Sequence, residues 1–176
     1  VYQYKINHGI RPTAIPAIYA VYTIVVFGVT YTLTIYNNGE ILIKAGQKII
    51  DTASAAGKAV MGAAKYLINS ALKKIEENKK IGESKKRVND VLRNKKKEKT
   101  TKGNTDIYSD PNKGGLPAAE QDFNKMNEGP TRKYPNGTKV GQLPDGTSIN
   151  VRSKSGDGRP TIEIQRKKGN NIKIRY

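Results

Sequence analysis

Near the end of the chain, apolar and polar residues alternate with a period of two in three short segments. Every second residue is apolar in Ser148–Arg152 and Thr161–Gln165, and the same holds for Asn171–Tyr176. Successive side chains of a β-strand point to opposite faces, so this pattern predicts three strands with one apolar and one polar face. Residues typical of tight turns precede the first segment at 144–146 and separate the three segments at 156–158 and 169–170. The segments therefore predict an antiparallel meander.

A short helix is predicted just before the meander. Leu116–Glu128 has Pro117 in its first turn, and Gly129 follows its last residue. We expect this helix to cover the apolar face of the meander. The predicted fold class is therefore α+β, with a short C-terminal helix packed on a small antiparallel sheet. A largely helical region, which includes an apolar segment able to insert into a membrane, is expected to precede it.

The apolar segment is Ile15–Tyr36, within a stretch from Thr13 to Gly39 that has no charged residue. It is long enough to cross a bilayer as a helix, which takes about 20 residues. It is also rich in Val, Ile, Thr and Tyr, which favours buried strands joined near Gly28. Both interpretations are open at this point. The chain starts at Val1, and no cleavage motif of a secretory signal follows the segment, so we expect a fragment of a longer protein.

The middle of the chain predicts a helix and then a linker. Ile41–Ile75 repeats apolar residues at helical spacing, and its small residues indicate close helix contacts or a membrane-facing hairpin. An ordinary amphipathic helix fits this stretch equally well. Lysine and glutamate dominate Lys73–Lys102, which is typical of a solvated helix and linker, and 103–115 is rich in turn residues. We therefore divide the chain into domains 1–102 and 103–176.

Net charge and missing residue types limit the chemistry. The chain has 32 lysines and arginines against 15 acidic residues, a formal charge of +17, which predicts attraction to nucleic acid or an anionic membrane. There is no cysteine, which excludes disulfides, thiolate metal sites and a cysteine nucleophile. The single histidine, His8, argues against a zinc site or a Ser-His-Asp triad. We therefore expect no metal and no cofactor.

The polar face of the predicted meander gathers cations around one carboxylate. Glu163 shares this face with Asn150, Arg152, Thr161, Lys173 and Arg175. RNA cleavage by transphosphorylation needs a base for the 2′-hydroxyl proton, cations for the phosphorane and an acid for the leaving oxygen. A carboxylate ringed by guanidinium groups supplies the first two. The alternative interpretation is an ordinary cross-strand ion pair on an exposed sheet face.

Four runs of residues in this region resemble a known toxin family. They are 143–146 (LPDG), 151–156 (VRSKSG), 158–164 (GRPTIEI) and 172–176 (IKIRY). The runs look like the terminal toxin domains of bacterial polymorphic toxins, found at the ends of contact-dependent inhibition proteins and Rhs/YD-repeat proteins. Such domains are assigned to the barnase/EndoU/colicin/RelE superfamily, a helix-plus-sheet fold that cleaves RNA, often tRNA. The similarity covers roughly residues 103–176.

The resemblance implies which residues form an RNase site. The catalytic residues would be Arg152, Ser155, Thr161, Glu163 and Arg175. The residues expected to contact RNA are Asn150, Lys154, Arg159, Lys173 and Tyr176. The sequence departs from part of this superfamily, because barnase-like and EndoU-like members use histidine as acid or base and residues 103–176 contain none. Lys173 or Tyr176 would then donate the proton, or the leaving group would depart with help from arginine alone.

The resemblance also implies a function for the whole chain. It would be an antibacterial toxin, with 103–176 acting as a metal-independent endoribonuclease on tRNA and 1–102 as a translocation region. Residues 15–72 would contact a membrane during delivery. Expected partners are RNA, an acidic immunity protein in the producing cell and, in some cases, a host elongation factor. Such a toxin is secreted or displayed by a bacterium and acts in the cytoplasm of the target cell.

Three other functions fit parts of the sequence. A membrane-active toxin would form a pore with Ile15–Leu72 and use the basic tail for recruitment to anionic lipid. A DNase would need a metal site, for which Asp106 and Asp110 are a weak pair, more typical of turns. Non-enzymatic RNA binding is disfavoured because few aromatic residues interrupt the basic C-terminal strands.

Overall fold

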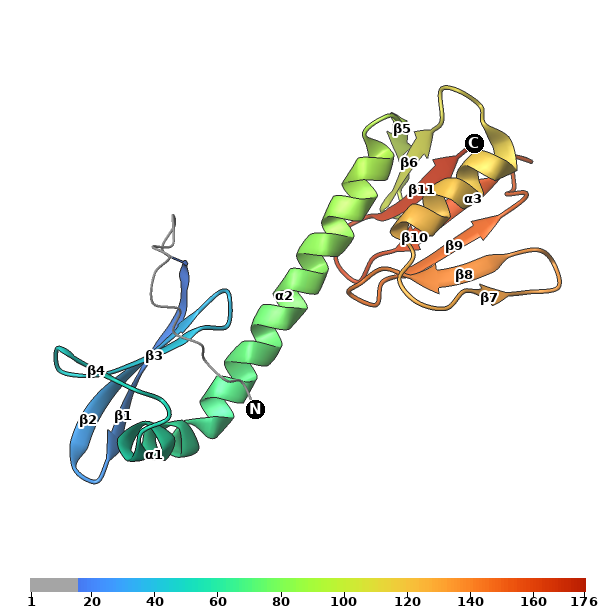
Figure 1. The fold of residues 1–176 in the computed structure, drawn as a ribbon. Coiled ribbons are helices and arrows are strands. Elements are labelled where there is room, and N and C mark those ends of the chain that lie inside the picture. The colour runs from blue at the N-terminus through green and yellow to red at the C-terminus, as the bar shows by residue number, and fades with distance from the viewer. Residues whose placement is uncertain (1–15) are drawn as a thin grey trace, which may run out of the picture. The chain divides into compact units, whose positions relative to one another are not determined.

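The computed structural model describes residues 16–176 and shows two compact units (Figure 1). The units divide between Asn78 and Lys79, whereas the sequence analysis placed its boundary after Lys102. Residues 79–102 therefore belong to the second unit. His8, which bears on the metal-site argument, lies outside the described residues.

The first unit contains a four-stranded antiparallel sheet in the order β1-β2-β3-β4. The strands are β1 (Ile18–Val26), β2 (Val29–Tyr36), β3 (Ile41–Ala45) and β4 (Lys48–Ile50). The expected apolar segment thus forms a β-hairpin from Ile18 to Tyr36, and its interpretation as a spanning helix is wrong. Within the described part of the chain, no helix combines the length and the apolar composition needed to cross a membrane.

Side-chain chemistry explains why this segment forms strands. Tyr31, Leu33 and Ile35 are buried on one face of β2, while the threonines between them point to the other face. Valine, isoleucine, threonine and tyrosine all favour such a pleated, half-buried surface. Phe27 and Gly28 form the turn and have positive φ angles of 50° and 77°. Two consecutive residues with positive φ are typical of the tight hairpin turn that matches strand twist.

The helix expected over Ile41–Ile75 is correct only in its second part. Its first ten residues form β3 and β4, and the helices that follow are α1 (Ala55–Ala63) and α2 (Lys65–Leu92). Helix α2 continues through most of the charged run, as the charge pattern predicted. The remainder of that run becomes a strand rather than a linker.

A close backbone approach explains one of the small residues in this region. A Cβ atom at Gly57 would lie 2.1 Å from the backbone oxygen of Asp51, so no larger residue fits there. Ser54 caps α1, and its hydroxyl accepts a hydrogen bond from the Gly57 amide at 3.0 Å. The core of the first unit consists of Tyr31, Leu33, Ile35, Ile43, Val60, Ala64, Ile68 and Ala71.

The second unit is built on a seven-stranded sheet in the order β5-β6-β11-β10-β9-β8-β7. The strands are β5 (Lys96–Thr100), β6 (Thr105–Ser109), β7 (Arg132–Lys133), β8 (Lys139–Gln142), β9 (Ser148–Arg152), β10 (Thr161–Gln165) and β11 (Asn171–Arg175). Strands β6 and β11 run parallel, and the other neighbours are antiparallel. Helix α3 (Gly115–Met126) lies over one face (Figure 1).

This sheet corrects the expected small antiparallel meander. The three predicted strands are confirmed as β9, β10 and β11, and the predicted helix is confirmed as α3. Strands β5 and β6 extend the sheet at one edge, and β7 and β8 extend it at the other. All residues of β5 are exposed and most are charged. Lysine-rich edge strands are a common protection against edge-to-edge association. Because β5 lacks alternating apolar residues, its sequence does not predict a strand.

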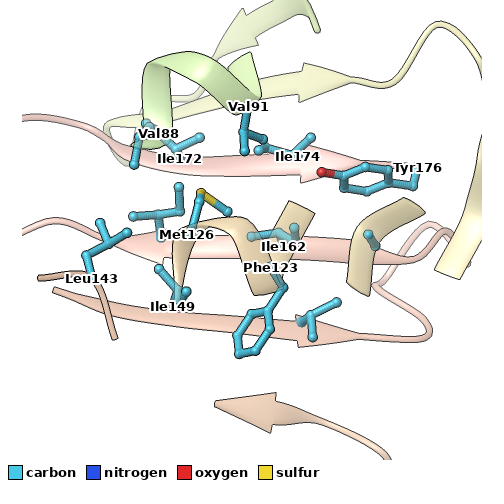
Figure 2. Close-up of a cluster of buried hydrophobic side chains, with 13 residues drawn as sticks. Val88, Val91, Phe123, Met126, Leu143, Ile149, Ile162, Ile172, Ile174 and Tyr176 are labelled. Carbon is cyan, nitrogen blue, oxygen red and sulfur yellow. The ribbon is translucent and has the colours of Figure 1, made fainter. Parts of the chain in front are cut away.

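The core of the second unit lies between the sheet and its helices (Figure 2). It comprises Val88, Val91, Ala119, Phe123, Met126, Leu143, Ile149, Val151, Ile162, Ile164, Ile172, Ile174 and Tyr176. Phe123 and Met126 of α3 are completely buried against the central strands. The last turns of α2 contribute Val88 and Val91, which lie near Ile172 and Ile174 in Figure 2. The predicted apolar face is therefore the inner face of the sheet.

The two phenylalanines of the chain provide a matched test of this core. Phe123→Ala is expected to lower the free energy of unfolding by about 3–5 kcal/mol, because a fully buried ring leaves a cavity. Phe27 is 93% exposed in the β1–β2 turn. Phe27→Ala should change the free energy of unfolding by less than about 0.5 kcal/mol. Equilibrium unfolding in urea measures both effects, and equal losses would contradict the core assignment.

Candidate functional site on the polar face of the sheet

Strand register organises the polar face of the seven-stranded sheet. The valines and isoleucines of β9, β10 and β11 are buried, so the side chains between them point to the opposite face. Across these strands Asn150 pairs with Glu163, and Glu163 pairs with Lys173. The next row consists of Arg152, Thr161 and Arg175. The register thus brings onto one face the six residues that the alternation predicted there.

Glu163 lies between two cations. Its Oε1 atom is 2.7 Å from Lys173 Nζ, and its Oε2 atom accepts a hydrogen bond from Arg152 Nη2. The Glu163 side chain is 20% exposed. Burial raises the pKa of Glu163, but the hydrogen bonds and charges of Lys173 and Arg152 outweigh it and lower the pKa below 4.5. The carboxylate is therefore ionised and partly accessible at neutral pH.

Three buried polar atoms on this face have unused hydrogen-bonding capacity, and two of them lie next to the Glu163 carboxylate. Asn150 Oδ1, Arg152 Nε and Arg175 Nε are buried and have no hydrogen-bond partner within the described part of the chain. Buried polar groups in folded proteins nearly always have one. Asn150 and Arg152 both border Glu163, by register and by direct contact respectively. A bound polar ligand would satisfy such groups.

Arg175 belongs to a separate group of charges. Its Nη1 atom is 3.0 Å from Asp157 Oδ2 and 3.6 Å from Glu98 Oε2. Arg159 contacts the same two carboxylates at 2.8 Å and 3.7 Å. Ser155 Oγ donates a hydrogen bond to Asp157 Oδ1 at 2.5 Å. This bond, together with those from Arg159 and the charge of Arg175, lowers the pKa of Asp157 against the opposing effect of burial.

The predicted site residues therefore form two groups rather than one. The Glu163 group consists of Glu163, Asn150, Arg152 and Lys173. The Asp157 group consists of Asp157, Glu98, Ser155, Arg159 and Arg175. Thr161 is completely buried between them, and its hydroxyl donates to the Arg159 carbonyl at 3.1 Å. Lys154 is exposed on the β9–β10 connection and belongs to neither group.

Tyr176 lies on the apolar face, as the alternation predicts, and not on the face expected to bind RNA. It is 5% exposed, and its hydroxyl donates a hydrogen bond to Asp122 Oδ2 at 2.9 Å. The Lys95 Nζ atom lies 4.5 Å from the centre of its ring and 3.0 Å from Asp122 Oδ2. Burial, followed by the charge of Asp122, raises the pKa of Tyr176 far above 10.0. Its position and its pKa both argue against Tyr176 as the proton donor.

The two aspartates considered as a weak metal pair have structural contacts. Asp110 Oδ2 accepts a hydrogen bond from the Gly114 amide at 3.2 Å, and Asp110 Oδ1 is 3.4 Å from Lys95 Nζ. Asp106 Oδ1 is 2.8 Å from Lys97 Nζ. Across residues 16–176, no group of three or more His, Cys, Asp or Glu side chains could hold a metal ion.

An open hollow of about 320 Å³ adjoins the Glu163 group. Its lining residues are Tyr134, Asn136, Thr138, Val140, Asn150 and Arg152. The sequence analysis missed the first four of these, although 135–137 (PNG) is a typical hairpin-turn signal. That turn joins β7 to β8 and so places these residues beside β9. Glu98, which lies in the lysine-rich strand β5, was likewise not predicted from the sequence.

Comparison with known proteins identifies no relative. No protein-family model, curated protein or solved structure matches the chain. The resemblance to polymorphic toxin domains therefore stays a prediction, and a function must be inferred from the residues and geometry of this chain.

Acid is expected to destabilise the second unit through its paired carboxylates. Hydrogen bonds from Lys97 and then Thr100 lower the pKa of Asp106 from 3.8 to about 2 in the folded chain. A lowered folded-state pKa stabilises the protein at neutral pH, and this contribution is lost as the pH falls from about 4 to about 2. Asp106→Asn should therefore lower the melting temperature at neutral pH. Plotted against pH, the melting temperatures of the variant and the wild type should converge near pH 2. Calorimetry across this range would contradict the assignment if the curves stayed parallel.

Proposed function

We propose that the second unit is a metal-independent endoribonuclease that cleaves RNA, with tRNA as the expected substrate, by attack of the 2′-hydroxyl. The observation that carries this proposal is the Glu163 group. It holds an ionised, partly exposed carboxylate between Arg152 and Lys173 on a central strand. A base beside cations that can bind phosphate is the minimum that this reaction requires. The net charge of +17 also favours binding to RNA.

The three charged members of the group each have a defined role in this proposal. Glu163 accepts the proton of the 2′-hydroxyl, whose oxygen forms a bond to the neighbouring phosphorus. Arg152 stabilises the charge that develops on the non-bridging oxygens. Lys173 donates a proton to the 5′-oxygen as its bond to phosphorus breaks. The products are a 2′,3′-cyclic phosphate and a 5′-hydroxyl, and proton exchange with water restores both side chains.

Substrate binding would strengthen Glu163 as a base. In the free protein, Arg152 and Lys173 lower its pKa, which keeps it ionised but makes it weakly basic. A bound phosphate would attract both cations toward its oxygens and remove part of their interaction with the carboxylate. The pKa of Glu163 would then rise toward its ordinary value. Base strength would thus increase when the substrate is in place.

The Asp157 group would support the site rather than carry chemistry. Its two carboxylates, Asp157 and Glu98, balance the charges of Arg159 and Arg175. The Glu163 group, in contrast, has two cations for one carboxylate. An anionic substrate therefore binds more favourably to the Glu163 group than to the Asp157 group. We propose that the Asp157 group holds the β9–β10 connection against the sheet.

We also propose that the chain acts as an antibacterial toxin. The excess of cations favours an acidic immunity protein that covers the RNA-binding face, since complementary charge gives fast association. Delivery from a bacterium into the cytoplasm of a target cell, and any need for a host elongation factor, rest on the resemblance to polymorphic toxin domains. Purification of the chain with a co-expressed acidic partner, and loss of cleavage in the complex, would test this role.

A matched pair of glutamate substitutions tests the RNase. Glu163→Gln should reduce cleavage of total tRNA in EDTA by roughly 10²–10⁴-fold, the usual contribution of a general base. Glu120→Gln is the control, because Glu120 forms a comparable ion pair with Lys139 at 2.6 Å, between α3 and β8. It should leave cleavage unchanged. Equal activity of both variants would reduce the Glu163 group to an ordinary cross-strand ion pair.

The pH dependence of cleavage follows from the environment of Glu163. Burial raises its pKa, but Lys173 and Arg152 together lower it below 4.5. The ionised form is the active base, so kcat/KM should be constant from neutral pH down to about 4.5 and fall only below that value. Initial rates at low substrate concentration measure this profile. A decline that begins near pH 6 would indicate a different base.

A further inference from the structure

We infer that the hollow beside Arg152 binds the base of a single-stranded nucleotide next to the cleaved phosphate. This inference rests on the proposed RNase function and specifies how its substrate is held. The hollow opens on the same face as Glu163, because Val140 of β8 pairs with Asn150, which in turn pairs with Glu163. Its volume of about 320 Å³ lies at the lower end of the range of about 300–1,000 Å³ typical of small-molecule sites.

Tyr134 provides an aromatic surface at one side of the hollow. It is 44% exposed, so its ring is available for stacking. Its backbone is fixed on both sides, because its amide donates to the Thr138 carbonyl at 2.9 Å and its carbonyl accepts from the Gly137 amide at 3.0 Å. Gly137 has a φ angle of 81°, which this tight turn requires. Base stacking on an exposed aromatic ring is a common mode of single-strand RNA recognition.

Asn150 provides hydrogen bonds at another side of the hollow. It is 9% exposed, and its Oδ1 atom has no hydrogen-bond partner in the described part of the chain. The χ2 angle of asparagine has two broad minima, so the amide can turn either its oxygen or its nitrogen to a ligand. Nucleobase edges carry donors and acceptors side by side, which an asparagine amide matches. The unsatisfied amide thereby gains a partner when a base occupies the hollow.

Arg152 links the hollow to the chemistry. Its side chain lines the hollow, and its Nη2 atom also donates to Glu163. A nucleotide with its base against Tyr134 and Asn150 would place its phosphate near this guanidinium. A base inside a duplex is already stacked and paired, so the hollow selects unpaired nucleotides, such as those in tRNA loops.

Binding to an uncleavable RNA tests the hollow independently of catalysis. The probe is a short, fluorescein-labelled single strand in which fluorine replaces every 2′-hydroxyl, compared with the same backbone without bases. Tyr134→Ala should weaken binding of the base-bearing strand roughly 5- to 100-fold, as expected for loss of one stacked base. It should leave binding of the abasic strand unchanged. The slope of log Kd against log salt should also stay the same, because stacking releases no counterions.

Two control variants define the role of the ring. Tyr134→Phe keeps the aromatic surface and should bind like the wild type. Tyr66 is 83% exposed in the first unit, and Tyr66→Ala should also bind like the wild type. Wild-type affinity of Tyr134→Ala, or an equal loss on the abasic strand, would overturn the inference.

The two proposals fail in distinguishable ways. If Glu163→Gln cleaves tRNA as well as the wild type does, the proposed catalytic group is wrong, and the binding assay still decides whether the hollow holds a base. If cleavage requires Glu163 but Tyr134→Ala binds the base-bearing strand normally, only the inference that the hollow binds a base is wrong.

Discussion

The two-sided environment of β10 is the constraint on which the rest of the second unit depends. Ile162 and Ile164 are completely buried beneath α3 and its neighbours, and the period of a strand therefore places Glu163 on the opposite face. Pairing with β9 and β11 then sets Arg152 and Lys173 beside the carboxylate. A slip of one residue would expose both isoleucines, so the position of the carboxylate is specified as strongly as the core. Packing on one face thus preorganises the charged groups on the other.

Charge is distributed unevenly over the polar face, and this difference distinguishes the group with a structural role from the group with the proposed catalytic role. The Asp157 group is balanced and ties the β9–β10 connection to the sheet, whereas the Glu163 group has an excess of cations. The Glu163 group also contains two of the three buried atoms that lack partners in the described part of the chain, and the third is Arg175 Nε of the Asp157 group. The ion pair between Glu120 and Lys139 shows that the chain also uses such pairs away from this face. Geometry of a single pair does not distinguish the two uses. The proposal rests instead on the excess of cations, the accessible carboxylate and the adjoining hollow.

Local patterns predicted the parts of the fold that depend on local signals. Alternation identified β9, β10 and β11, and it also predicted that Arg152, Lys173 and Arg175 share the face of Glu163. It did not predict that only Arg152 and Lys173 contact Glu163, whereas Arg175 contacts Asp157 and Glu98. The spanning helix was wrong because valine, isoleucine, threonine and tyrosine fit an apolar helix and a half-buried strand alike. The pairing of β6 with β11 joins residues far apart in the chain and leaves no local signature. Burial of Thr161 was likewise unpredictable, since alternation placed it on the polar face and carries no information on what covers a residue there.

The central claim is that the Glu163 group cleaves RNA through attack of the 2′-hydroxyl, and the chemical ends of the fragments test it most directly. The measurement is an analysis of tRNA fragments produced by the full chain in EDTA, by mass spectrometry. The proposal predicts 2′,3′-cyclic phosphate on the upstream fragment and a 5′-hydroxyl on the downstream fragment. Fragments with 3′-hydroxyl and 5′-phosphate ends, or RNA that remains intact, would contradict it.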